Sequence, residues 1–336
     1  MILNGWATRP SRCTPRATAM FSCSRSRRRS TRALRCWSLR KKWPTERLVE
    51  PVLAHQRWTN KKYIGKTTMT IQETSVIYRA EGETSLKLHL FLPDKNAGRR
   101  AAILFFHGGR FIQGHPAQFF PHCRYFASRG MVAASATYRL LGKNARTVLD
   151  CFADSRAAIE WLRTHADDLA IDPAQVVLAG GSAGANLAAN AAMGLPEEQR
   201  NDASRISSAP DALVLFSPAV VRPRAEQDLL DARLYAQLRP RAHLPPMLLL
   251  HGGEDEVFAL DALQDFCQQM TLAGTICQLQ LYPGGRHGFF NYRAEDTRPF
   301  FETVGEVERF LGRLGLLQGN STLSGEQIKT LRHEGD

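Results

Sequence analysis

From about residue 70 to residue 316, short apolar runs alternate with longer segments whose apolar residues recur at helical spacing. Short apolar runs bounded by Gly, Pro or polar residues are typical of strands that are buried on both faces. They predict strands at 101–106, 131–137, 176–179, 212–216, 246–250 and 276–281. Two further segments, 75–78 and 86–92, alternate apolar and polar residues around a Glu-Gly-Glu turn, which predicts an antiparallel hairpin.

The segments between these strands have the pattern of amphipathic helices. Between Val148 and Leu162, apolar side chains recur every three or four residues, which indicates one core-facing stripe. Helices are predicted at 147–165, 260–272 and 300–311, and another begins near Ala185. Strands that alternate with helices indicate the α/β class, here a mostly parallel central sheet with helices on both faces and an antiparallel N-terminal hairpin.

The regular pattern covers 69–316, a length that suits a single domain. Residues 218–244 contain three prolines and several arginines and fit no strand. We therefore expect them to form a small cap inserted over the carboxyl ends of the strands. Residues 317–336 are predicted to be a polar tail.

The net charge of +12 is confined to the N-terminal segment. Residues 1–43 contain twelve Lys or Arg residues and no Asp or Glu, so the rest of the chain is close to neutral. Three interpretations of the basic leader, 1–68, stay open: a disordered tail, a targeting segment, or translated sequence upstream of a start at Met20 or Met69. It lacks the apolar core of a secretory signal, and no segment of the chain has the ~18 apolar residues of a membrane span. Its sparse aromatic residues do not favour nucleic-acid binding.

The seven cysteines show neither close Cys pairs nor the spacing of a zinc site. We expect unpaired, mostly buried thiols in a reducing compartment, and on that basis a cytoplasmic protein.

Ser182 lies in the sequence GGSAG at 180–184, directly after the predicted strand 176–179 and directly before a helix. A sharp strand-to-helix turn exposes a serine hydroxyl and requires flanking residues without bulk. The amino end of the following helix points free N–H groups toward the reacting centre. Ser182 is therefore the predicted nucleophile.

A serine nucleophile needs a base, and the base needs a carboxylate that orients it. Asp255 follows the predicted strand 246–250, and His287 lies in the glycine-rich loop after the last strand. Because the carboxyl ends of parallel strands meet at one edge of a sheet, we expect Ser182, Asp255 and His287 to converge there. Their order along the chain is that of the nucleophile-elbow architecture.

Other residues compete for the acid and base roles. The competing carboxylates are Glu254, Glu256 and Asp261, and the four-residue offset from His251 favours Asp255. We interpret His107 and His251, which begin glycine loops, as groups that brace those loops through hydrogen bonds to backbone.

The developing oxyanion needs preorganised donors. Candidate donors are the amides of Gly108, Gly109 and Arg110, in the loop after strand 101–106, and the amide of Ala183.

Together these motifs resemble α/β-hydrolases of the acetyl esterase/lipase branch, akin to hormone-sensitive-lipase-like and bacterial feruloyl/acetyl-xylan esterase-like proteins. The matching pieces are HGG at 107–109, YRL at 138–140, Asp154 with Ala158 and Trp161, GGSAG at 180–184, NLA at 186–188, HG and Asp at 251–255, and HGF at 287–289. The resemblance implies the α/β-hydrolase fold and hydrolysis of carboxylic esters through an acyl-enzyme, without a cofactor or a metal. Because the cap is short, we expect a small-molecule ester with a short, acetyl-like acyl group. An acylated sugar is one candidate, and the sequence leaves the oligomeric state open.

Two positions depart from the family pattern. Arg110 stands where a third glycine is usual, so either the oxyanion hole is impaired or the guanidinium recognises a substrate carboxylate. Ala185 stands where a further glycine is common, and one methyl group there should be tolerated.

Two alternative functions stay open at this point. A serine peptidase of the same fold uses the same triad, and a ligand-binding protein on a hydrolase scaffold would make no use of it. Since the base must be neutral to accept a proton, an esterase mechanism predicts activity that falls below about pH 6–7.

Overall fold

The computed structural model describes residues 71–93, 98–193, 209–225, 230–236 and 238–319. The predicted leader, 1–68, lies outside the described residues, as do parts of the predicted cap and most of the predicted tail. Leu317, the first residue of that tail, is buried against the domain.

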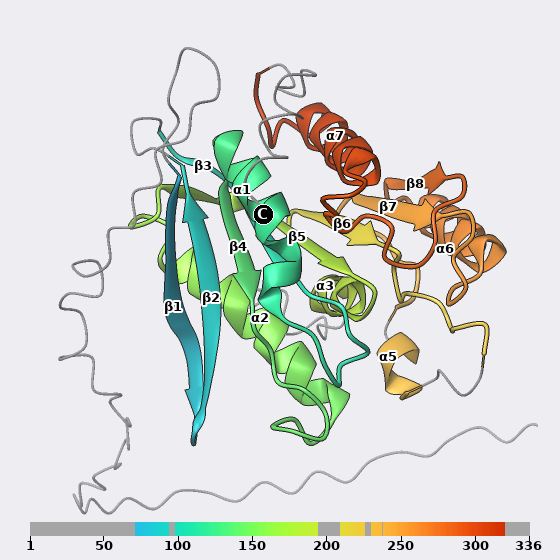
Figure 1. Ribbon diagram of the computed structural model, residues 1–336, viewed down its shortest axis with the longest axis horizontal. Helices are drawn as coiled ribbons and strands as arrows, with labels where there is room; N and C mark the ends of the chain where they lie inside the picture. The colour runs from blue at the N-terminus through green and yellow to red at the C-terminus, as the bar shows by residue number, and fades with distance from the viewer. Residues whose placement is uncertain (1–70, 94–97, 194–208, 226–229, 237, 320–336) are drawn as a thin grey trace, which may run out of the picture. The chain divides into compact units, whose positions relative to one another are not determined.

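An eight-stranded sheet runs through the domain in the order β1-β2-β4-β3-β5-β6-β7-β8 (Figure 1). Its strands are β1 (Gln72–Glu81), β2 (Thr84–Leu92), β3 (Arg100–Phe106), β4 (Val132–Ala136), β5 (Ile171–Gly181), β6 (Ala212–Phe216), β7 (Met247–Gly252) and β8 (Cys277–Tyr282). The β1–β2 hairpin is antiparallel, β2 also pairs antiparallel with β4, and all later pairs are parallel. The predicted fold class is confirmed.

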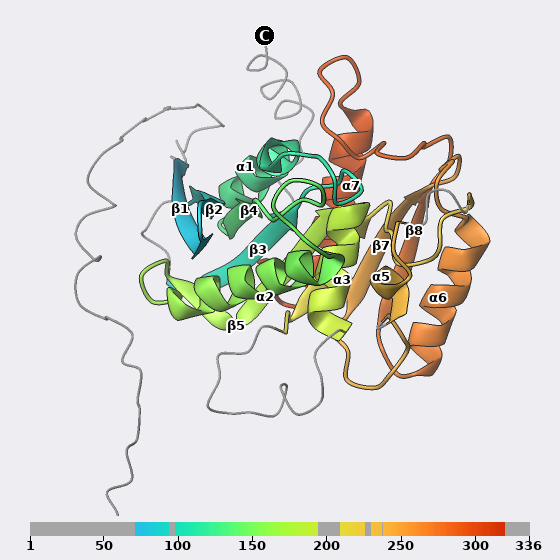
Figure 2. The same ribbon diagram turned by 90° about the horizontal axis from the view of Figure 1, so that it is seen from below.

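Helices cover both faces of this sheet (Figure 2). They are η1 (Pro116–Phe119), α1 (Phe120–Ser128), α2 (Val148–Thr164), α3 (Ala183–Met193), α5 (Arg233–Ala236), α6 (Leu260–Leu272) and α7 (Arg298–Arg313). Thr147 begins α2 with a reciprocal capping box to Asp150, which explains why the helix starts there. Among the described helices, none combines the length and the apolar content that a membrane span requires.

Elements η1, α1 and β5 differ from the sequence predictions. The sequence analysis did not predict η1 and α1, whose starts carry Pro116 and Pro121. Proline breaks a helix in its interior but is favoured in the first turn, where the missing N–H would have no partner. Strand β5 begins at Ile171, earlier than predicted, because Ile171 pairs with Arg100 across an irregularity in the ladder.

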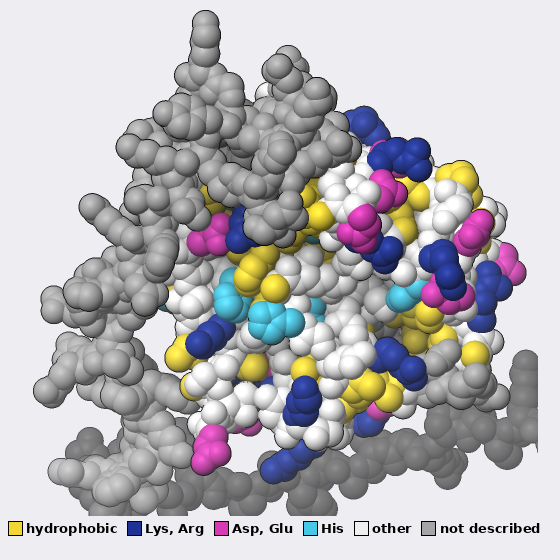
Figure 3. Space-filling view, viewed as in Figure 1, with side chains coloured by type: hydrophobic (Ala, Val, Ile, Leu, Met, Phe, Trp, Pro, Cys, Tyr) yellow, Lys and Arg dark blue, Asp and Glu magenta, His cyan; other side chains and the backbone are white. Residues whose placement is uncertain are grey.

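Acidic and basic side chains lie interspersed on the face of the molecule shown in Figure 3. This mixture agrees with the nearly neutral charge of the chain beyond residue 43.

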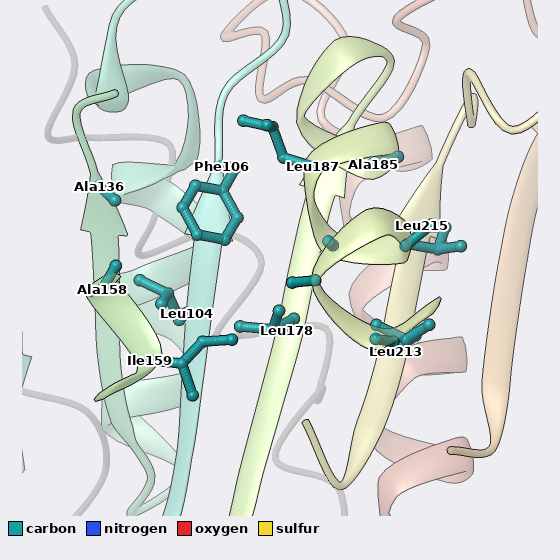
Figure 4. Packing of buried hydrophobic residues seen from close by; sticks show 14 of the residues in the cluster. Leu104, Phe106, Ala136, Ala158, Ile159, Leu178, Ala185, Leu187, Leu213 and Leu215 are labelled. Carbon is teal, nitrogen blue, oxygen red and sulfur yellow. The ribbon is translucent and has the colours of Figure 1, made fainter. Parts of the chain in front are cut away.

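The strand residues alternate between two separate cores, as expected for a sheet covered on both sides. In β3, Leu104 and Phe106 face α2, α3 and α6, whereas Ile103 and Phe105 face α1 and α7. We call the first core the α3 face and the second the α7 face. Figure 4 shows the α3 face, where the small side chains of α3 pack closely against leucines of the central strands.

Candidate active site

Ser182 lies at the turn between β5 and α3, in a left-handed conformation with φ 51°. Its amide donates to the carbonyl of Phe216 (2.9 Å), which fixes the turn against β6. A Cβ on Gly180 would lie 2.4 Å from backbone atoms of Gly184, and a Cβ on Gly181 would lie 2.5 Å from the ring of Phe290. The glycines around Ser182 are therefore required by close packing as well as by the turn.

The structure brings the three predicted residues together in one hydrogen-bonded chain. The Oγ of Ser182 lies 3.0 Å from Nε2 of His287, and Nδ1 of His287 lies 2.9 Å from Oδ2 of Asp255. With the proton on Nδ1, the imidazole donates to the carboxylate and leaves Nε2 free to accept from the serine. This is the arrangement that activates a hydroxyl for nucleophilic attack.

The Asp255 carboxylate is buried but well supplied with donors. Its Oδ1 accepts from the amides of Val257 (2.9 Å) and Phe258 (3.0 Å). Burial raises the pKa of Asp255, but the bonds from His287 and these two amides outweigh burial and leave the pKa lowered. Asp255 therefore stays ionised and can hold the imidazole.

The competing acids have other roles in the structure. Glu256 accepts a hydrogen bond from the backbone amide of His287 (3.1 Å) and does not contact the imidazole nitrogens. Asp261 lies in the first turn of α6 and is exposed, as is Glu254. The geometry thus singles out Asp255 as the partner of His287.

Of the two bracing histidines, His107 behaves as predicted. Its Nδ1 lies 2.7 Å from the carbonyl of Gly108, and its ring stacks on Tyr138, whose hydroxyl donates to the His107 carbonyl (2.9 Å). Burial lowers the pKa of His107 to about 4, so the ring is neutral and Nδ1 donates. His251 lies buried with its Nδ1 3.6 Å from Oδ2 of Asp255. Burial lowers the pKa of His251, and the Asp255 charge and a hydrogen bond to the backbone of Phe258 oppose that shift.

The loop after β3 requires a correction to the predicted set of oxyanion donors. The amide of Gly108 donates to Oε1 of Gln118 (2.7 Å), so it is already occupied. Gly109 has φ 116°, and a Cβ there would lie 2.1 Å from the carbonyl oxygen of Gln113. The donors that fit the role are the amides of Gly109, Arg110 and Ala183, the last of which begins α3 and has no partner within the helix.

Ser182 and His287 open into a cavity of about 150 Å³. Its walls are mainly apolar and include Phe111 from the loop after β3, Phe258 from the loop after β7, and residues of the predicted cap. The cap contributes Ala219, Pro223, Leu230, Leu234 and Tyr235. Arg110 is the cationic residue of the lining. Within the described ranges, no group of three His, Cys, Asp or Glu residues is arranged to hold a metal ion.

Comparison with known proteins gives matches over this region. Residues 103–242 match a family model described as alpha/beta hydrolase fold, and residues 237–308 match one described as the dienelactone hydrolase family. Similar solved structures include esterase 2 of Thermogutta terrifontis with butyrate bound, which is 35% identical with a TM-score of 0.66. That match covers 74% of this chain and 96% of the esterase. The same esterase phosphorylated by paraoxon is 36% identical, with a TM-score of 0.66, and covers 74% of this chain and 96% of that chain.

More distant relatives have related descriptions. Esterase LipQ of Mycobacterium tuberculosis is 26% identical over 287 residues, which cover 75% of this chain and 66% of LipQ. A probable isoprenylcysteine alpha-carbonyl methylesterase of Arabidopsis thaliana, ICMEL1, is 24% identical over 240 residues, which cover 60% of this chain and 48% of the relative. The chain thus spans between about half and two thirds of the length of these two relatives.

Proposed function

The chain belongs to the α/β-hydrolase family, and from that premise we propose that it is a serine carboxylesterase acting on esters with short acyl groups. The single observation that carries the proposal is the hydrogen-bonded chain from Ser182 through His287 to Asp255, which opens into a small apolar cavity.

The geometry supports a two-step mechanism. Ser182 Oγ attacks the ester carbonyl while His287 Nε2 accepts its proton, and Asp255 stabilises the imidazolium that forms. The amides of Gly109, Arg110 and Ala183 stabilise the oxyanion. His287 then gives its proton to the departing alcohol, which leaves an acyl group on Ser182. Water, activated by His287, releases the acid and restores the serine.

The cavity volume supports the preference for short acyl groups. An apolar cavity of about 150 Å³ holds a molecule of the size of benzene, which is enough for a butyryl group but not for a palmitoyl chain. The similar Thermogutta esterase 2 has been seen with butyrate and with propionate bound. We therefore propose acyl groups of roughly two to four carbons, with acylated sugars among the candidate substrates.

The test is hydrolysis of p-nitrophenyl esters from acetate to palmitate by the full chain, with Ser182→Ala as the blank. We expect serine-dependent turnover that is highest between acetate and butyrate. Paraoxon should inactivate the protein stoichiometrically and leave Ser182→Ala unlabelled. A maximum at palmitate would overturn the acyl assignment, and faster cleavage of matched amides would favour a peptidase. Absence of both turnover and labelling would favour a binding protein.

A further inference from the structure

Two side-chain amides connect the loop that carries the oxyanion donors with the loop that carries His287. Gln118 accepts from the amide of Gly108 through Oε1 (2.7 Å) and donates through Nε2 to Oδ1 of Asn291 (2.9 Å). Asn291 in turn donates through Nδ2 to the carbonyl of Gly288 (2.8 Å). The chain of bonds begins at the residue after His107 and ends at the residue after His287.

The direction of these bonds is fixed at both ends. A backbone N–H can only donate and a backbone carbonyl can only accept. Gly108 therefore requires the oxygen of Gln118, and Gly288 requires the nitrogen of Asn291. The Nε2 of Gln118 is then left to donate to the Oδ1 of Asn291. Turning the amide of Gln118 alone would place two acceptors against each other, and turning that of Asn291 alone would place two donors against each other.

The sheet does not join these two loops through neighbouring strands. β3 and β8 are not neighbours, because β5, β6 and β7 lie between them. The adjacent residues add an apolar contact to the polar one: the rings of Phe119 and Phe290 stack with centroids 5.9 Å apart and an angle of 11°. The bridge and this stacked pair are thus direct connections across the sheet edge.

The bridge also lies against the reacting centre. A Cβ on Gly108 would be 3.5 Å from the Cβ of Ser182 and 3.1 Å from the carbonyl of Gly181. Gly288 adopts φ 79° directly after His287, and a Cβ there would be 3.1 Å from Nδ2 of Asn291. A shift of either loop would therefore change the distance between the oxyanion donors and the base.

We propose that Gln118 and Asn291 are positioning residues, which act together to keep the oxyanion loop and His287 at the separation that the reaction needs. The inference rests on the proposed esterase function. Neither side chain touches the reacting atoms, so both act through the backbone of Gly108 and Gly288. Misplacement by about 1 Å is enough to cost about 100-fold in rate.

The test is a double-mutant cycle in the full chain with Gln118→Met and Asn291→Leu, which remove the amides and keep the side-chain size. With p-nitrophenyl butyrate we expect each single variant to lower kcat about 10- to 100-fold with KM nearly unchanged. We expect the double variant to be no slower than the slower single variant, because either change alone breaks the bridge. Gln264→Met, an exposed glutamine on α6, is the matched control and should keep wild-type kcat.

Gln118→Glu separates the bridge from the simple anchoring of Gly108. It keeps the acceptor for Gly108 but replaces the donor that faces Asn291, so we expect a loss in kcat close to that of Gln118→Met. It also keeps the loop anchored if Gln118→Met fails to fold. Urea unfolding of each variant shows that the kinetics are measured on folded protein.

Three outcomes would overturn the proposal: wild-type kcat in Gln118→Glu, losses that multiply in the double variant, or a lower stability with unchanged kcat. Each of these presupposes an active wild type. A wild-type protein that neither hydrolyses esters nor reacts with paraoxon would instead refute the esterase function, so the two failures are distinguishable.

Discussion

The two faces of the sheet are packed in different ways. On the α3 face, helix α3 is built almost wholly of small buried residues, so its backbone lies close to the strands beneath it. On the α7 face, large aromatic side chains fill the space between the sheet and its helices. The fully buried rings there are those of Phe91, Phe105, Phe119, Phe126, Phe216, Phe290, Phe300 and Phe310.

This difference predicts that the glycines around Ser182 tolerate substitution to different degrees. In the turn that carries Ser182, Gly180 and Gly184 approach backbone, which no side-chain adjustment relieves, whereas Gly181 approaches the ring of Phe290. The loop that carries His287 is held by Phe289 and Phe290, whose rings belong to the α7 face. Side chains can adjust their rotamers, whereas two backbones in contact must move as units. Substitutions at Gly180 and Gly184, which meet backbone, should therefore be tolerated less well than a substitution at Gly181, which meets the ring of Phe290.

The largest effect is expected from Gly184→Ala on the α3 face. A Cβ there would lie 1.9 Å from the carbonyl oxygen of Phe106 and 2.6 Å from that of His107. Because both are backbone atoms at the end of β3, we expect the free energy of unfolding to fall by more than about 3 kcal/mol and the esterase activity to be lost. Urea unfolding measures the first and butyrate ester turnover the second. Ala185→Gly in the same helix is the control and should cost about 1 kcal/mol.

A smaller effect, and one that can be suppressed, is expected from Gly181→Ala. Its Cβ would meet ring atoms of Phe290 at 2.5 Å and of Phe119 at 3.2 Å, which are the ends of side chains. We expect a loss of about 2 kcal/mol in unfolding free energy. Adding Phe290→Leu should recover about 1 kcal/mol of the summed losses.

The matched control for this recovery is the double variant Gly184→Ala with Phe106→Leu. Since Gly184 would meet the carbonyl of Phe106 and not its ring, this pair should show no such recovery. Equal recovery in both pairs would remove the distinction between the two faces.

Much of this organisation is predictable from the sequence, because it depends on local patterns. Helix α6 was predicted with its observed bounds, 260–272, and the apolar runs identified β3 and β6. Ser182, Asp255 and His287 were found because each follows a strand, and parallel strands bring their carboxyl ends together.

What the sequence did not predict depends on contacts between distant residues. Gln118 and Asn291 are 173 positions apart, and neither belongs to a pattern that marks it. The same bond network removes Gly108 from the oxyanion donors, so that error has the same cause. Helix α1 was not predicted, although its one proline, Pro121, lies in the first turn, where proline favours a helix start.

An effect of about 2 kcal/mol is expected from a buried histidine on the α7 face. His122 is fully buried among Phe105, Phe119 and Phe300, and its ring nitrogens have no partner among the described residues. Burial lowers the pKa of His122 to about 3, whereas an unfolded histidine titrates near 6.5. As the pH falls below about 6.5, His122 binds a proton in the unfolded state but stays neutral in the folded state. The free energy of unfolding therefore falls.

Between about pH 7.5 and pH 5 this loss amounts to about 2 kcal/mol for His122. His107, whose pKa burial lowers to about 4, adds a loss of the same sign. His122→Phe should shrink the difference in unfolding free energy between the two pH values by about 2 kcal/mol. An unchanged difference would show that this ring is not held neutral by the aromatic packing of the α7 face.

The smallest effect is expected from Arg110→Gly, at the strand ends where the two faces meet. Arg110 has φ 57° and is exposed, so its left-handed backbone is not enclosed as that of Ser182 is. Relief of this conformation, worth about 1 kcal/mol, is offset by the greater freedom of glycine in the unfolded chain. We expect unfolding free energy to change by less than about 1 kcal/mol and turnover of neutral butyrate esters to change about threefold or less, since the amide remains. A tenfold gain in kcat would instead mean that the arginine side chain impairs the oxyanion hole. A selective loss on esters of dicarboxylic acids would assign its guanidinium to a substrate carboxylate.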